Sequence, residues 1–337
     1  MKDLMQVPSI RRPTSIEKRI LHVVVLGAVI ALALAFVDFS NVWRMLLSVR
    51  PFHLVLMLLL ATASRWLMSW KWLLLLRASG VEVPFSRTVK AYYQSSVISY
   101  IPFLVLGADL FRIHDVSREK GEAPAVIASV VMEKAQGLIS AFLLGTVGLI
   151  ITLSVHSAEQ AAVLGVVSVG GLIASVLLLV ISLRDGVHRH GLRLLQKWIP
   201  DRLKRGLERF SQAFRSMRGQ HLVLAKTLAL AILEHLVQFL VLFAAGRAIG
   251  VVQPAVLFLA AISLAMVARR LAIYLEGWGL AQAVSVFLFS VLGIGVDQAL
   301  ALSLLADAVT AVASLPGAVL LLVRSPGLAE ESNSNQS

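Results

Sequence analysis

Apolar segments fill most of this chain, and several of them carry ionisable residues at the depth of a membrane. Glu133 and Lys134 stand side by side in one such segment, Asp109 and Arg112 close another, and Asp307 stands alone in the last. A charged side chain in hydrocarbon costs about 3 kcal/mol on insertion scales, so it is usually retained where it faces a cavity or a partner. The pattern predicts an all-α integral membrane protein with a polar site in its interior.

Composition and charge support this class. Hydrophobic residues make up 58% of the 337 residues, more than a soluble domain usually contains. The net charge of +12 comes from Lys and Arg between the apolar segments, as in the positive-inside pattern, and does not point to nucleic acid. The chain has no cysteine, which excludes disulfides and thiolate metal sites. No catalytic or nucleotide-binding motif is present, so we expect neither an enzyme nor a cofactor.

The lengths of the apolar segments predict the domain organisation. A membrane-crossing helix needs about 20 apolar residues. We expect a cytoplasmic segment over 1–19, about eight membrane segments within 20–323, and a polar tail over 324–337. The expected segments are 20–37, 52–76, 91–108, 124–155, 161–183, 221–250, two short runs within 254–296, and 299–323. The first also fits a signal peptide, but no small-residue cleavage site follows it, which favours a retained helix.

The charges of the loops predict the orientation. The basic, amphipathic segment 184–220 is expected to lie on the anionic cytoplasmic leaflet of the inner membrane. That placement, with both termini cytoplasmic, requires 91–108 to enter the membrane and return without crossing. The stretch 254–296 is also short and interrupted, so the halves would form an inverted repeat with a site at their interface. Two thin full spans over 254–296 are the alternative.

The first half holds the clearer candidate site. Asp109 and Arg112 are three residues apart and can pair on one helix face, next to a helix break expected at Gly107. Glu133 belongs to a polar, small-residue stripe that should face protein or water, and Lys134 can reach an acidic partner. The alternatives are a solvated helix start and a structural ion pair between helices.

The second half offers a looser set of candidates: Arg269, Arg270, Glu276, Gly277 and Gly279. Two adjacent guanidinium groups can hold a phosphate bidentately, and the glycines mark a second backbone break that permits close approach. An ordinary loop with arginines is the alternative. In the last span Asp307 can bind a cation or a proton, or pair with an arginine. Asp307 and Glu133 are therefore the candidates for proton or ion coupling.

Two further groups of residues have a structural interpretation. Arg65 precedes three tryptophans between residues 66 and 72, a pattern typical of an aromatic belt at the membrane interface. Glu234 and Gln238 share a helix face, which favours a hydrogen-bonded network between packed helices.

Three short motifs carry a resemblance to a known family. They are the tryptophan- and leucine-rich run 65–77, Gly107-Ala108-Asp109 followed by Arg112, and Glu133-Lys134 followed by Gly137-Leu138. In this order they resemble the flippase-like membrane domain of lysylphosphatidylglycerol synthases, over about residues 20–323. The resemblance implies a multi-pass domain that binds or moves lipids, with re-entrant segments and a central cavity. The synthase activity of that family belongs to a separate soluble domain, which is not found in this sequence.

The chain departs from the family pattern at several positions. Ala108 stands where the family has a second glycine, and Lys134 stands where it has arginine. The late segment 276–282 lacks the usual Arg-Glu pair, and Glu276 stands where a glycine is usual. The first-half site therefore carries over better than the second.

These observations predict a protein that binds or translocates an amphipathic lipid with a charged or phosphate-bearing headgroup. The expected inner half-site is Asp109, Arg112, Glu133 and Lys134, and the opposing half is Arg269, Arg270 and Glu276. The expected partners are membrane lipids, chiefly anionic or phosphate-bearing ones, and lipid-biosynthesis enzymes. A membrane-embedded enzyme acting on a lipid headgroup and a scaffold subunit of a lipid-synthesis complex are the alternatives.

Overall fold

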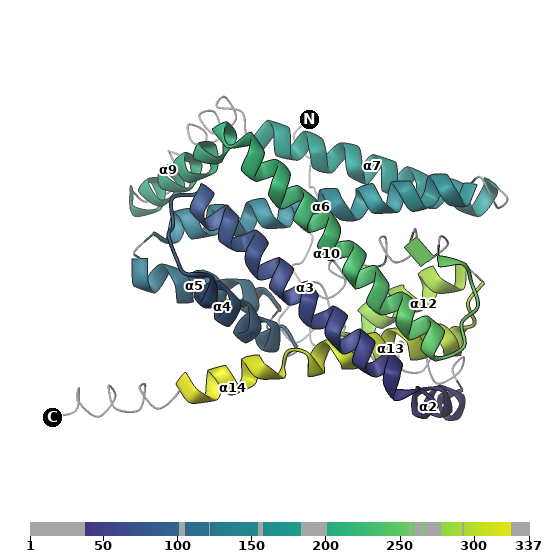
Figure 1. Ribbon diagram of the computed structural model, residues 1–337. Coiled ribbons are helices and arrows are strands. Elements are labelled where there is room, and N and C mark those ends of the chain that lie inside the picture. Colours follow the sequence, from purple (N-terminus) through teal and green to yellow (C-terminus); the bar gives the residue numbers. More distant parts are fainter. Residues whose placement is uncertain are drawn as a thin grey trace, which may run out of the picture.

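The computed structural model describes residues 38–100, 105–120, 122–153, 158–182, 201–255, 258–259, 265, 278–291 and 293–324. Every regular element within these ranges is a helix, which confirms the predicted all-α class (Figure 1). The helices are α2 (Phe39–Leu47), α3 (Pro51–Ala78), α4 (Phe85–Ile98), α5 (Val105–Lys120), α6 (Ala123–Leu153), α7 (Ala158–Ser182), α9 (Asp201–Ser216), the short 3-10 helix η1 (Met217–Gly219), α10 (His221–Ala248), α12 (Trp278–Val291), α13 (Val296–Val312) and α14 (Leu315–Arg324).

Four stretches are long and apolar enough to cross a membrane: Pro51–Ala78, Ala123–Gly148, His221–Ala248 and Val296–Val323. The shortest has 26 residues, about 39 Å at 1.5 Å per residue, which exceeds a hydrocarbon core of about 30 Å. These candidate spans coincide with the segments predicted over 52–76, 124–155, 221–250 and 299–323. Helix α7 contributes a shorter apolar stretch, Ser168–Val180, and the segment expected over 20–37 lies outside the described residues.

Helices α3 and α10 form an antiparallel pair through the middle of the molecule (Figure 1). Gln220, at the start of α10, donates from Nε2 to the carbonyl oxygen of Ala78 at the end of α3, over 3.0 Å. Toward the other end, Ala61 of α3 and Ala245 of α10 belong to one buried cluster. Small residues at such a contact let the helix backbones approach closely.

The predicted membrane segment 91–108 is divided between two short helices. Helix α4 has 14 residues, about 21 Å, which is too short to cross a bilayer alone. Helix α4 ends at Ile98 and α5 begins at Val105, so Gly107 lies inside a helix and the helix break comes before it. A glycine within a helix costs only about 1 kcal/mol, which packing readily offsets. Helix α4 packs closely on α14, where Gly317 faces the backbone of Tyr93.

Part of the basic segment expected on the leaflet surface is described as α9. This helix packs against α6, and its residues Phe210 and Phe214 join a buried cluster with Leu75 and Met132. Arg209 on the same helix is exposed. The phenylalanine face of α9 is therefore covered by protein and does not lie on lipid.

Candidate functional site

Six ionisable side chains form one network that runs from the surface into the interior. In spatial order they are Lys134, Asp109, Arg112, Glu133, Lys71 and Glu234. Positive and negative groups alternate along it, three of each, so the network is electrically balanced. Balance matters because a charge taken out of water is tolerated only when its partners offset the lost hydration.

Arg112 is the centre of this network and is 2% exposed. Its Nη2 lies 2.9 Å from Oδ1 of Asp109, and its Nη1 lies 2.8 Å from Oε2 of Glu133. The guanidinium carbon lies 4.9 Å from the ring centroid of Trp72 and 4.7 Å from that of Tyr92. These distances suit cation–π contacts, which strengthen when water is excluded. The guanidinium group is thus held by two carboxylates and two aromatic rings.

Glu133 and Lys71 extend the network from α6 through α3 to α10. The Nζ of Lys71 lies 3.9 Å from Oε1 of Glu133 and forms a direct ion pair with Oε2 of Glu234. The hydroxyl of Tyr92 donates to Oε1 of Glu133. Nε2 of Gln238 donates to Oε1 of Glu234 over 3.0 Å. A chain of contacts therefore runs from α5 to α10 through three helix interfaces.

The opposite end of the network reaches the surface at Lys134. Its Nζ lies 2.8 Å from Oδ2 of Asp109, and the two side chains are 43% and 20% exposed. Helix α5, which carries Asp109, is not among the four candidate spans. Burial acts to raise the pKa of Asp109, but Arg112 and Lys134 outweigh it and hold that pKa below its usual range. Asp109 and Lys134 are the members that a molecule from outside can reach.

The polar stripe predicted on α6 faces protein. Ser129 accepts a hydrogen bond from Nε1 of Trp72 over 3.1 Å. Further along the helix, Nε2 of Gln136 donates to Oγ1 of Thr227 over 2.9 Å. Ser140 lies 3.0 Å from Nδ1 of His235 on α10. These contacts also confirm the predicted hydrogen-bonded network on α10, since Thr227, Glu234, His235 and Gln238 all take part in it.

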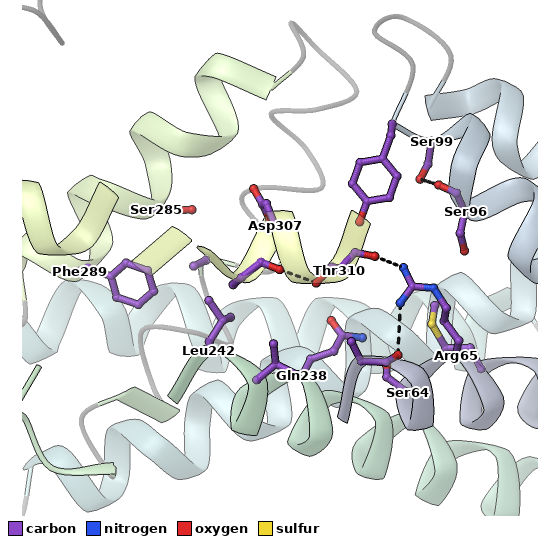
Figure 2. A pocket seen from close by; sticks show the side chains of 16 residues that line it. Ser64, Arg65, Ser96, Ser99, Gln238, Leu242, Ser285, Phe289, Asp307 and Thr310 are labelled. Carbon is purple, nitrogen blue, oxygen red and sulfur yellow. Dashed lines mark hydrogen bonds between the residues drawn. The ribbon is translucent and has the colours of Figure 1, made fainter. Parts of the chain in front are cut away.

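A cavity of about 310 Å³ lies between α3, α4, α10, α12 and α13 (Figure 2). Its polar wall includes Ser64, Arg65, Ser96, Ser99, Tyr100, Gln238, Ser285, Asp307 and Thr310. Arg65 lies near the midpoint of α3, about 20 Å from either end at 1.5 Å per residue. The cavity therefore lies beside the middle of this candidate span.

Among the described residues of this wall, two are charged, Arg65 and Asp307. Arg65 is 6% exposed and donates to backbone carbonyls, from Nη1 to Ala61 over 3.2 Å and from Nη2 to Thr310 over 2.7 Å. It also donates to Oγ of Ser314. The carboxylate of Asp307 accepts a hydrogen bond from Nε2 of Gln282. Arg65 is thus held by residues of α3 and of the last span, whereas Asp307 is held by a residue of α12.

Residues 19–317 match the family model described as the Lysylphosphatidylglycerol synthase TM region. The chain belongs to this family. No curated protein matches the chain. The match covers the network and the cavity alike, and it supports a multi-pass membrane protein.

The two first-half motifs that resemble this family meet in the structure. Asp109 and Arg112 pair at i and i+3 as the spacing predicted, and Glu133 and Lys134 complete the cluster. The second-half family residues cannot be placed in the same way: Arg269, Arg270, Glu276 and Gly277 lie outside the described residues. Gly279 is the second residue of α12 and therefore lies inside a helix.

Four residues of the network and the cavity wall were not among the predicted site residues: Arg65, Lys71, Tyr92 and Glu234. Arg65 was assigned to an interfacial belt, yet it is buried, whereas Trp66 and Trp70 are 51% and 50% exposed. Its separation from Trp72 is seven residues, which puts both on one helix face, away from the exposed tryptophans. Among the described residues, no three potential ligands converge on a position for a metal ion.

Proposed function

We propose that this protein binds amphipathic lipids with a charged or phosphate-bearing headgroup and moves them across the membrane. The observation that carries the proposal is the cavity of about 310 Å³ with Arg65 and Asp307 on its wall, near the midpoint of a candidate span. A headgroup in such a cavity keeps polar partners at a depth where lipid offers none. The acyl chains would stay in the surrounding bilayer.

In this proposal the ion-pair network forms the inner half of the route. Asp109 and Lys134 are its exposed members and would meet a headgroup first. Arg112 and Glu133 are already paired, so a headgroup would have to exchange with one of these contacts. The network reaches the cavity through Gln238, which bonds to Glu234 and also lines the cavity. Glu133 and Asp307 are the proposed carriers of a coupling proton or ion.

The proposal includes the finer architecture expected from the sequence. Helices α3 and α10 have 28 residues each and pack antiparallel, as equivalent helices of an inverted repeat would. Arg269, Arg270 and Glu276 would form the outer half of the route. The basic segment 184–220 and both termini would lie on the cytoplasmic side of the inner membrane, and 91–108 would be re-entrant.

Reconstitution tests the proposal. The purified protein would be placed in liposomes that hold one fluorescent lipid in both leaflets, and an impermeant reductant would then bleach the outer leaflet. We expect the reductant to bleach more of a phosphate-bearing lipid than the fraction that lies in the outer leaflet. For a neutral diacylglycerol probe, the bleached fraction should be the same with and without the protein. If a folded, inserted protein accelerates no lipid of the panel, the proposed function is wrong.

A further inference from the structure

We infer that Arg65 forms a phosphate-binding site inside the cavity, an inference that rests on the proposed function and names the residue that receives the headgroup. Three cations of the described residues are at least nine-tenths buried: Arg65, Lys71 and Arg112. Lys71 and Arg112 each have carboxylate partners. Within the described ranges, no carboxylate oxygen lies within 4.0 Å of Arg65. A buried cation with neutral partners alone is costly, so it is a candidate for function.

The guanidinium group keeps donor capacity for a ligand. It donates to the carbonyls of Ala61 and Thr310, and its hydroxyl partners are Ser314 and Tyr100. Its Nε atom is buried and has no hydrogen-bond acceptor among the described residues. Arginine presents its N–H groups in a planar fork that matches two oxygens of a phosphate at once. The backbone contacts fix the group in place, and a phosphate that enters would take the unused Nε donor or replace a hydroxyl partner.

The surroundings of Arg65 also suit an oxyanion. Ser96 and Ser99 line the same cavity from the α4 side (Figure 2), and Tyr100 lines it too. The two serine hydroxyls donate to the backbone carbonyls of Tyr92 and Ser96. Hydroxyl groups can rotate to donate hydrogen bonds to whichever oxygen is present. The cavity of about 310 Å³ corresponds to about ten water molecules at their share of liquid volume, which is ample for a headgroup.

Asp307 gives the inference a second test because its negative charge repels an anion in the cavity. It lines the same cavity, and its carboxylate is bonded to Gln282. A negative charge in the wall weakens the binding of a phosphate, and its neutral isostere should strengthen it. Arg65 and Asp307 substitutions should therefore change phosphate binding in opposite directions, which general damage to the fold would not do.

The experiment compares phosphatidic acid with diacylglycerol of the same acyl chains, since these two probes differ only in the phosphate. Binding to the full-length protein in detergent would be measured by native mass spectrometry. We expect Arg65→Gln to weaken the binding of phosphatidic acid by about tenfold or more and to leave the binding of diacylglycerol unchanged. Arg65→Lys, which keeps the charge but loses the fork, should fall between Arg65→Gln and the wild type. Asp307→Asn should bind phosphatidic acid more tightly than the wild type.

A separate arm with inorganic phosphate distinguishes a lipid headgroup from a free anion. If phosphate alone competes at millimolar concentration, the site takes the free anion; if only phosphatidic acid binds, the acyl chains are required. Unchanged preference for phosphatidic acid in Arg65→Gln or in Arg65→Lys would overturn the inference, even if the wild type moves lipid. The wild type could instead prefer phosphatidic acid in a way that depends on Arg65 and yet move no lipid in liposomes. That result would contradict the proposed function and leave this inference standing.

Discussion

Nη1 of Arg112 lies 2.8 Å from Oε2 of Glu133, and this contact joins α5 to α6. The two residues belong to separate short motifs, and each motif supplies ion-pair partners to the other. Together they place a guanidinium between two carboxylates and over two aromatic rings. The charged motifs therefore form one unit, buried at its centre, whose members depend on one another.

Glu133→Gln tests this dependence. The substitution keeps the shape but leaves three cations and two carboxylates in the network, so we expect a loss of about 3–5 kcal/mol in the free energy of unfolding. The variant should still insert in the membrane and should lose lipid movement. Thermal unfolding in detergent measures the first effect and the liposome assay the second.

Glu208→Gln on the exposed face of α9 is the control, and its free energy of unfolding should stay within about 0.5 kcal/mol of the wild type. Parental stability and transport in Glu133→Gln would remove Glu133 from the proposed route.

Lys71 and Glu234 allow a double-mutant cycle across α3 and α10. Either single change to methionine leaves an unbalanced buried charge, whereas the double change keeps the network neutral. We expect the double variant to be more stable than the sum of the single losses predicts, with a coupling energy of about 1–3 kcal/mol. Strictly additive losses in thermal unfolding would mean that the pair does not form in the membrane.

The sequence allowed some of these contacts to be predicted and not others. Asp109 and Arg112 are three residues apart, so helix geometry alone predicts their pairing. Lys71 and Glu234 are far apart in the chain, and which helices meet there depends on packing that one sequence does not reveal. The four spans follow from the length of uninterrupted apolar runs, whereas the break before α5 depends on how α4 and α5 pack. The burial of Arg65 was not predicted, because the tryptophans that follow it in the sequence indicated a position at the membrane interface.

Gly317 allows α14 to lie directly against α4. A Cβ atom at this position would be 2.0 Å from the carbonyl oxygen of Tyr93. Gly317→Ala should therefore force the helices apart and cost about 1–3 kcal/mol in thermal unfolding. Gly170 in α7 is the matched control, since nothing lies within 4 Å of an added Cβ there. Gly170→Ala should be neutral or stabilising by up to about 1 kcal/mol. Equal effects of the two changes would contradict the close packing of α14.

The proposed orientation is open to cysteine labelling, because the chain has no cysteine of its own. We expect Gln212→Cys on the exposed face of α9 to be labelled only after the cells are opened, since basic segments stay in the cytoplasm. Ser157→Cys, between α6 and α7, should be labelled from outside by the same impermeant reagent. The reverse pattern would rule out the proposed topology and, with it, the inverted repeat.

The most direct test of the account is the rate of lipid movement in liposomes after the cavity is filled. Ser96 lines the cavity from α4 and is only partly buried, so Ser96→Phe places a ring in the open space. Ser290→Phe adds the same ring at an exposed position of α12 and serves as the control. We expect Ser96→Phe to slow movement of phosphate-bearing lipid by about tenfold or more, a change of about 1.4 kcal/mol in the barrier, while Ser290→Phe matches the wild type. Movement at the wild-type rate by a folded Ser96→Phe protein would contradict a route through this cavity.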